Sequence, residues 1–338
     1  MLLTDGSSAP AELAEVQAAL KDGTLIWLDV LQPGPDDVAA LTDTFGLHPL
    51  AAEDLTEFGQ RPKAEDFGNL VYMVSYGLAG KVSDEPGFDV SSLGVTEVHC
   101  FYAEKFLVTV RHAGCHSLEQ MRKRVEAQVA QLASEHELPA GERPVRLILL
   151  HHLMHSLSDS FFPALSTFDD RMDDLQEQIF ARPTNDQLAE LFSMQRWLVQ
   201  VRKLISPQRD MIASLVSGMV NLPGMTAASD PYLRDLYDHL IRISDEIDSY
   251  RDMLSNAMSA YLSTVSNNLN VVMKQLAIIA TIFLPLSFLT GFFGQNFSWL
   301  VARLGSLASF LVLGLGFEAV AVAGLYWMFR RRGWIGGS

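Results

Sequence analysis

Two long apolar runs near the carboxyl end constrain this chain more than any other feature of its sequence. The run from Leu276 to Phe293 contains no charged residue, and a second run from Leu304 to Phe329 is followed by three arginines, 330–332. A helix rises about 1.5 Å per residue, so each run is long enough to cross a hydrocarbon core of about 30 Å. The sequence therefore predicts two membrane-spanning helices joined by a short connection.

Basic residues beside these runs predict their orientation. Lys274 precedes the first run and three arginines follow the second, whereas the connection between them contains only Arg303. Basic residues near the ends of spans favour the cytoplasmic side, so both termini are predicted to be cytoplasmic in a multi-pass protein of the plasma membrane. The start of the chain shows no basic segment followed by an apolar one, so no cleaved signal peptide is expected.

The remainder of the 338-residue chain has the composition of an acidic, water-soluble part, and the formal net charge is −15 at pH 7. This balance disfavours nucleic acid as a partner, because phosphate backbones bind lysine and arginine, and it favours cations. The two cysteines, Cys100 and Cys115, lack CxxC spacing. Neither a disulfide framework nor a thiolate zinc site is therefore expected.

Residue patterns predict a small mixed sheet flanked by helices in the first part of the chain. The predicted strands are 24–31, 68–78, 94–102 and 105–111, the last two as a hairpin, and the predicted helices are 36–45, 48–55 and 117–136. Long helical patterns follow at 145–180 and 185–220, and a third helix begins near Asp230. The fold class is therefore predicted to be an α+β domain followed by long helices.

These patterns divide the chain into seven parts. We expect a cytoplasmic α/β domain at 1–140, an antiparallel helical pair at 141–228, a stalk helix at 229–269, a first transmembrane helix at 270–293, an external loop at 294–303, a second transmembrane helix at 304–329 and a basic cytoplasmic tail at 330–338.

The third helix has a heptad register that continues into the first span. One core position of the heptad is occupied by Leu236, Ile243, Tyr250 and Ala257. The other is occupied by Leu240, Ile247, Leu254 and Tyr261. The same spacing continues through Asn270, Met273, Ala277, Ala280, Leu284, Ser287 and Gly291, a face of mostly small, polar or flexible residues. One helix encloses no lumen, so a pore on this face requires several copies around an axis. The alternative is close packing of small residues in a membrane dimer.

Several segments carry a resemblance to a known family. Asn267–Asn270, the run IIATIFLPLSF and the closing Gly294-Gln295-Asn296 resemble the CorA family of divalent-cation channels, whose first span ends in Gly-Met-Asn. Gln295 stands where that methionine usually lies. The segments YLRDLYDHLIRISDEIDSY and HPLAAEDLTEFGQRPKAEDF are similar to the family's stalk and amino-terminal segment. The resemblance implies a funnel-shaped homopentamer whose first span lines the conduit.

The resemblance also implies roles along that span. Gly294, Gln295 and Asn296 would form a selectivity loop whose neutral oxygens contact the water shell of a hard cation. Asn270 matches a polar ring, and Met273, Leu276 and Leu284 match a hydrophobic gate, while Ser287 and Gly291 lie on the same face. The alternatives from the residues alone are an ordinary helix end for the loop and interface packing for the face.

The choice of ion is argued from the ligands that the pathway lacks. After His239 the sequence contains no histidine or cysteine, and after Asp252 its only carboxylate is Glu318. A hydrated, hard ion is therefore favoured over a stripped zinc ion. Glu318 lies near the middle of the second span, where an ionisable group is costly. Its expected role is structural, and the rival is proton coupling as in the zinc-transporting ZntB branch of the superfamily.

Four acids of the soluble part match regulatory positions of the family. Glu53, Asp54 and Asp235 match positions where divalent ions bind between neighbouring subunits, and Asp159 is a further candidate ligand. A cation there would neutralise facing carboxylates and hold the closed arrangement. From the residues alone, each is an ordinary surface acid.

Two other clusters are given structural interpretations. Asp169, Asp170, Asp173 and Asp174 are predicted to form a solvated helix face. His151, His152 and His155 include a pair spaced by four residues that suits a metal, but no third ligand is evident nearby, so no metal site is predicted there.

The sequence contains no nucleophile paired with a base, no P-loop and no dinucleotide fingerprint, so an enzyme is not expected. The predicted function is transport of divalent cations across the bilayer, with magnesium as both transported and regulatory ion, cobalt and nickel as further ions, and no other cofactor. The alternatives are a proton-coupled zinc transporter and a membrane-anchored cation sensor that does not conduct.

Overall fold

The structure is a computed structural model that describes residues 2–3, 12–80, 94–134, 145–225, 229–295 and 297–334. Asn296, the last residue of the predicted selectivity loop, lies outside the described residues. The chain divides into two compact units, Met1–Met258 and Ser259–Ser338. Each unit is described by itself below.

Among the described residues, six strands form one mixed sheet in the first unit. They are β1 (Leu2–Leu3), β2 (Ile26–Leu31), β3 (Lys63–Asp66), β4 (Leu70–Leu78), β5 (Val95–Ala103) and β6 (Phe106–Arg111). Their order is β1-β2-β6-β5-β4-β3, with β2 parallel to β6 and the other neighbours antiparallel. The predicted mixed sheet and the β5–β6 hairpin are confirmed.

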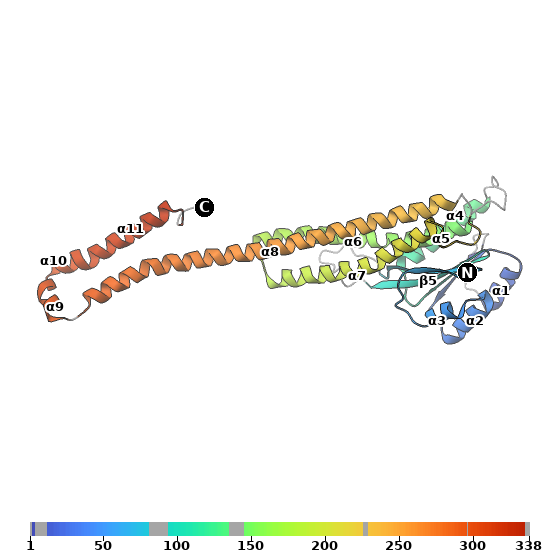
Figure 1. Ribbon diagram of the computed structural model, residues 1–338, viewed down its shortest axis with the longest axis horizontal. Coiled ribbons are helices and arrows are strands. Elements are labelled where there is room, and N and C mark those ends of the chain that lie inside the picture. Colours follow the sequence, from blue (N-terminus) through green and yellow to red (C-terminus); the bar gives the residue numbers. More distant parts are fainter. Residues whose placement is uncertain are drawn as a thin grey trace. The chain divides into compact units, whose positions relative to one another are not determined.

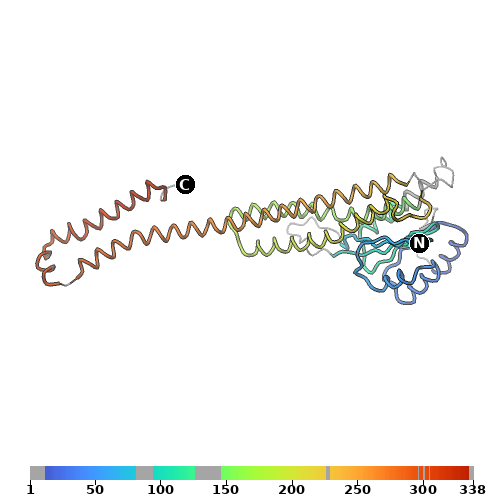
Figure 2. The backbone as a smooth tube through the Cα atoms, in the orientation of Figure 1, coloured from blue at the N-terminus to red at the C-terminus, as the bar shows by residue number. Residues whose placement is uncertain are grey.

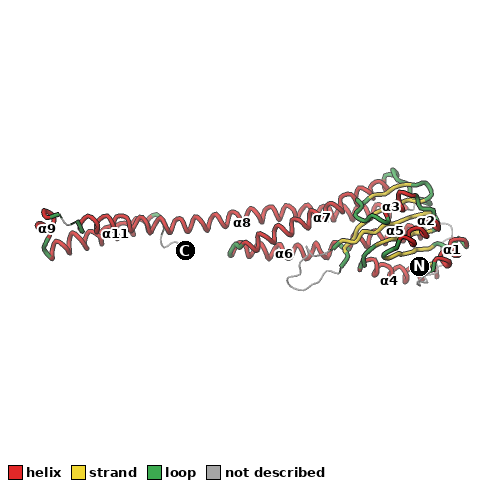
Figure 3. Tube along the Cα trace, turned by 90° about the horizontal axis from the view of Figure 1, so that it is seen from below, coloured by secondary structure: helices red, strands yellow, loops and turns green. Residues whose placement is uncertain are grey.

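Helices cover both faces of this sheet (Figures 1 and 3). The first face packs against α1 (Leu13–Lys21), α2 (Pro35–Phe45) and α3 (Pro49–Asp54), and the second packs against α4 (His116–Ser134) and α5 (Val145–Asp159). All nine residues of β4 are buried, as expected for a strand that is covered on both sides. Burying a large apolar side chain stabilises the fold by about 1.5–3 kcal/mol, so this strand is a centre of the core.

The predicted single helix at 145–180 is wrong, because the structure has two helices there. α5 ends at Asp159 and α6 spans Phe161–Ala181. Between them, the Oγ of Ser160 accepts a hydrogen bond from the Leu78 N–H at 2.8 Å and donates one to the Leu157 carbonyl at 2.6 Å. Ser160 thereby ties the junction of the two helices to the end of β4.

The long helices follow α6 as an antiparallel partner and a stalk. The chain turns back into α7 (Asn185–Val216), which lies antiparallel to α6 (Figure 2). α7 stops before the predicted residue 220, and Gly218 adopts a left-handed φ of 72° just beyond its end. α8 runs unbroken from Asp230 to Phe293, as predicted. In the first unit most of its buried residues follow the heptad register, among them Leu236, Leu240, Ile243, Ile247, Leu254 and Ala257, whereas Tyr250 of the same register is only partly buried.

The second unit contains the remainder of α8 and the helices that follow it. These are α9 (Ser298–Leu304), α10 (Leu307–Ser309), a π-helix (Phe310–Gly316) and α11 (Phe317–Arg331). In the part of the chain that the structure describes, α8 and the helical run Leu307–Arg331 are long and apolar enough to cross a membrane. This agrees with the predicted long helix and two carboxyl-terminal apolar helices. The segment predicted as the external loop includes α9.

Candidate ion pathway and metal-binding residues

The residues predicted to line a pore lie on one face of α8, and all of them are exposed in the single chain: Asn270, Met273, Leu276, Leu284, Ser287 and Gly291. The partly buried residues of the same stretch are Lys274, Ile278, Ile282, Pro285, Leu286, Leu289 and Phe293. With 3.6 residues per turn, Leu284 points about 200° away from Ile282. The exposed and partly buried sets therefore occupy opposite faces, and Leu284 on the exposed face is 77% exposed.

The predicted selectivity loop begins at the end of α8. The Gly294 N–H donates to the Thr290 carbonyl at 2.9 Å, and the Gln295 N–H donates to the Phe292 carbonyl at 3.3 Å. A Cβ at position 294 would lie 2.9 Å from the Thr290 oxygen, so this tight turn requires glycine. Gln295 is exposed directly beyond it.

Glu318 lies in the first turn of α11, directly after the π-helix. It is partly buried in the second unit. A π-helix inside an α-helical run is rare and is frequent at functional sites. The structure thus places the single carboxylate of the spans beside an unusual backbone segment.

Three of the four predicted regulatory acids, Asp54, Asp159 and Asp235, have side-chain partners within their own chain. Asp54, the last residue of α3, forms an ion pair with Lys63 at 2.8 Å, and Lys63 also pairs with Glu65 at 2.9 Å. Glu53, the neighbour of Asp54, is exposed. Sequence reasoning missed Lys63, although it lies in the same amino-terminal segment, because β3 was not predicted.

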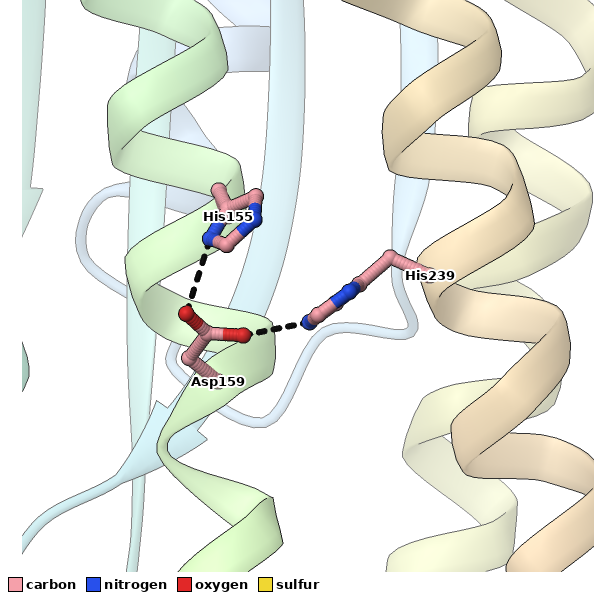
Figure 4. A group of neighbouring side chains, drawn as sticks. All are labelled: His155, Asp159 and His239. Atoms are coloured by element: carbon pink, nitrogen blue, oxygen red, sulfur yellow. Dashed lines mark hydrogen bonds and ion pairs between the residues drawn. The ribbon is translucent and has the colours of Figure 1, made fainter.

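The other two acids lie against histidines. The Nε2 of His151 on α5 lies 2.8 Å from the Asp235 carboxylate on α8. Asp159 bridges two imidazoles: the Nδ1 of His155 lies 2.8 Å from one oxygen, and the Nε2 of His239 hydrogen-bonds to the other (Figure 4). The absence of a third ligand near His155 was therefore a wrong prediction.

The hydrogen bonds in this cluster shift its titrations in opposite directions. Burial raises the pKa of Asp159, but hydrogen bonds from His155 and His239 outweigh burial and hold that pKa well below its usual value. The hydrogen bond to Asp159 raises the pKa of His155. Burial and the nearby His151 and His155 lower the pKa of His152. The Asp159 carboxylate is thus ionised at neutral pH and available as a ligand.

The sequence carries a spacing signal for each half of this cluster, but not for their contact. His151, His155 and Asp159 recur every four residues on α5, and Asp235 and His239 are spaced by four on α8. Residues four apart share a helix face, so the two rows are complementary lines of acids and imidazoles. Only the packing of α5 beside α8 shows that they meet.

Comparison with known proteins identifies a family and several proteins that this chain resembles. The sequence model of the family described as "CorA-like Mg2+ transporter protein" matches residues 22–331. The cobalt/magnesium transport protein CorA of Thermotoga maritima is 32% identical over 265 residues, which cover 78% of this chain and 71% of that protein. The zinc transport protein ZntB of Yersinia enterocolitica is 23% identical over 317 residues, covering 91% of this chain and 88% of its own.

A solved structure shows the same fold. The CorA magnesium transporter from Methanocaldococcus jannaschii superimposes with a TM-score of 0.75 at 21% identity, over 92% of each chain. At this identity the match supports the fold alone. It includes the sheet domain and the long helices described above.

Proposed function

The chain belongs to the CorA-like family of Mg²⁺ transporters and is a membrane transporter of divalent cations, and we propose that magnesium is its ion. The observation that carries this proposal is the face of α8 that stays exposed from Asn270 to Gly291. Polar or small residues, Asn270, Ser287 and Gly291, alternate on it with Met273, Leu276 and Leu284, whereas the partly buried face is mostly bulky. Several copies of α8, five by analogy with the family, bring these faces together around a conduit.

In this proposal the loop after α8 selects the ion, and α8 itself opens and closes the conduit. Gly294, Gln295 and Asn296 at the outer mouth present neutral oxygens to the water shell of Mg²⁺, which dehydrates reluctantly. Asn270 forms a polar ring, and Met273, Leu276 and Leu284 close the conduit by excluding water. Cobalt, named with magnesium for the Thermotoga relative, is expected to pass as well.

Regulation in this proposal comes from acids of the cytoplasmic part. Glu53 and Asp54 at the end of α3, together with Asp235 on α8 and Asp159 on α5, bind Mg²⁺ where neighbouring subunits meet. Asp54 and Asp159 already have partners within one chain, so an arriving ion competes with Lys63 and with two imidazoles. Loss of the ion loosens the subunits and opens the gate.

Glu318 favours a second candidate, a proton-coupled zinc transporter. It is the only carboxylate after Asp252, it follows a π-helix, and one relative is a zinc transport protein. A carboxylate in a span is by default a proton-relay candidate. In that case zinc uptake requires a pH gradient and is lost in Glu318→Gln.

Ion flux into liposomes separates the two candidates. The full-length protein is reconstituted, and Mg²⁺ and Zn²⁺ entry are recorded with and without a pH gradient. We expect Mg²⁺ flux that is indifferent to the gradient, and its loss in Asn296→Ala. The control is Gln275→Ala, which removes an exposed amide from the opposite face of α8 and should conduct normally. Zinc flux that depends on the gradient, or unchanged selectivity in Asn296→Ala, would contradict the magnesium proposal.

A further inference from the structure

A cavity of about 610 Å³ lies within the first unit, between α7 and the end of the sheet where β4 ends and β5 begins. Its walls come from α7, from β4 and β5, and from two connecting segments at 58–59 and 112–113. Ligand cavities in proteins measure about 300–1,000 Å³ and are mostly apolar, with a few polar groups that orient the ligand. We infer that this cavity binds an organic monoanion with an apolar body, such as an aromatic or medium-chain carboxylic acid.

The apolar part of the lining accommodates the body of such a ligand. Its apolar members include Phe58, Val95, Trp197, Val201 and Leu204. Three of them are spaced by four and three residues on α7, so they share one face of that helix. Aromatic side chains offer flat apolar surfaces that pack well against a ring or a hydrocarbon chain.

The buried carboxylate in the lining already has its partners. The Glu97 side chain is 6% exposed and accepts hydrogen bonds from the Gly59 N–H at 2.5 Å and the Gln60 N–H at 3.0 Å. The Nε2 of His99 lies 3.0 Å from the same carboxylate. Burial raises the pKa of Glu97, but these contacts outweigh burial and lower it, so the group is ionised. Because its oxygens are occupied, Glu97 is poorly placed to bind an organic cation.

The available hydrogen-bond donors lie at the exposed side of the cavity. Lys203, Gln200 and His112 line the cavity and are exposed. In the part of the chain that the structure describes, the Lys203 ammonium forms no ion pair. It can therefore bind a carboxylate head group while the apolar body enters the cavity, away from solvent.

The number of positive groups limits the charge of the ligand. The described lining residues include one lysine and no arginine. Phosphate-rich ligands are held by several backbone N–H groups, by arginines or by a helix N-terminus, whereas a single ammonium suits a single negative charge. The ionised Glu97 also disfavours a second negative charge deep in the cavity.

The cavity adjoins the segment that carries part of the proposed Mg²⁺ regulation. Phe58 lies in the connection from α3, whose last residue is Asp54, to β3, which begins with Lys63. Two N–H groups of this connection bond to Glu97 and thereby tie it to β5. The binding inference rests on the cavity alone, and it stands whichever ion the chain transports.

Calorimetry with the full-length protein in lipid nanodiscs tests this inference, and empty nanodiscs correct for partition into lipid. The probes are naphthoate and naphthylmethylammonium, which share a ring system and carry opposite charges. We expect one naphthoate per chain and binding of the ammonium that is weaker by about tenfold or more. Lys203→Gln should weaken naphthoate binding about tenfold, because it removes the charged donor.

Val95→Trp tests the cavity itself. Val95 lies on the same face of β5 as Glu97 and is 42% exposed, so the fold tolerates a larger side chain there, which fills the space for the ligand. Lys105→Gln is the matched control for Lys203→Gln, since it removes the same charge from an exposed position outside the lining. It should bind naphthoate like the wild type.

Two results would overturn the inference. One is naphthoate binding that is unchanged in both Lys203→Gln and Val95→Trp. The other is binding of the ammonium that equals or exceeds that of naphthoate, which would assign recognition to Glu97 and the ligand to the organic cations. Mg²⁺ flux is measured separately on the same variants, so a failure of the transport proposal is distinguished from a failure of ligand binding.

Discussion

Asp54 and Asp159 illustrate how the environment of a single carboxylate decides which cation it binds. Asp54 is paired with the ammonium of Lys63, a compact positive charge. A cation that binds the Asp54 oxygens must therefore displace this ammonium. Asp159 faces two imidazoles, which are themselves metal ligands. An ion that binds the first acid must therefore compete with an ammonium, and an ion that binds the second must compete with two imidazoles.

Lys63 is expected to set the sensitivity of the transporter to cytoplasmic Mg²⁺. Burial lowers the pKa of Lys63, but hydrogen bonds to Asp54 and Glu65 outweigh burial and raise it, so the side chain stays charged. Lys63→Gln frees Asp54 of its partner. A partly exposed pair of this kind is worth about 1 kcal/mol, so the Mg²⁺ concentration that halves the current should fall about fivefold.

This prediction is checked in inside-out membrane patches, with Mg²⁺ varied on the cytoplasmic face. Lys21→Gln is the control, because it removes the same charge from an exposed position at the end of α1. If both variants respond to Mg²⁺ like the wild type, the Lys63–Asp54 pair does not oppose ion binding.

At the scale of elements, the approach of α5 to β4 depends on one glycine. A Cβ at Gly77 would lie 2.9 Å from the Cδ2 of Leu157 and 3.3 Å from its Cα. Valine is otherwise favoured in strands, so its effect here isolates the steric contact. Gly77→Val should destabilise the protein by about 1–3 kcal/mol, because α5 must move off the sheet.

Thermal unfolding of the solubilised protein measures that loss. Gly114→Val serves as the control, since a Cβ there meets no atom within 4 Å and its φ is not left-handed. An unchanged melting temperature in Gly77→Val would show that the sheet and α5 adjust without cost.

The elements that were predictable are those with a strong pattern of their own. α8 was predicted to both ends because its heptads and the apolar run form one periodic pattern. β3 was missed because Lys63–Asp66 contains no β-branched or aromatic residue and becomes an edge strand only by pairing with β4. The break at Ser160 was missed because its cause is a hydrogen bond from Leu78, far away in sequence.

The candidate sites likewise divide into residues that the pattern of one helix predicts and residues that come together only through packing. The exposed face of α8 could be predicted, since it depends on spacing along one helix. The Asp159 cluster could not, because His155 and His239 lie on helices whose mutual packing is a property of the whole first unit. Lys63 was missed for a related reason, because its strand was not predicted.

At the scale of the whole molecule, the second unit leaves large apolar side chains exposed that lipid and further copies must cover. Ile279 is 53%, Phe317 57% and Val320 73% exposed. A soluble monomer rarely exposes an apolar patch of this extent. Lipid covers bulky residues of this kind, whereas the face with Asn270 and Ser287 is too polar for lipid and is better placed against other subunits.

Cysteine cross-linking tests which face of α8 meets other subunits. In the proposed pore, Leu284 from neighbouring chains lies near the axis, so oxidised Leu284→Cys should give mostly covalent dimers on denaturing gels. Ile282→Cys, about 200° away on the same helix, should cross-link several-fold less. Background from Cys100 and Cys115 is low, because both are fully buried and burial raises the pKa of the Cys100 thiol.

Native mass measurement completes this test, because one accessible cysteine per chain can join only two chains, whatever the size of the assembly. A pentamer with strong linking at position 284 agrees with a conduit lined by the exposed face. A particle of two chains with the same linking would instead indicate a packed membrane dimer, in which small residues bring two helices together. Stronger linking at position 282 than at position 284 would place the partly buried face at the subunit contact and remove the structural basis for the proposed pore.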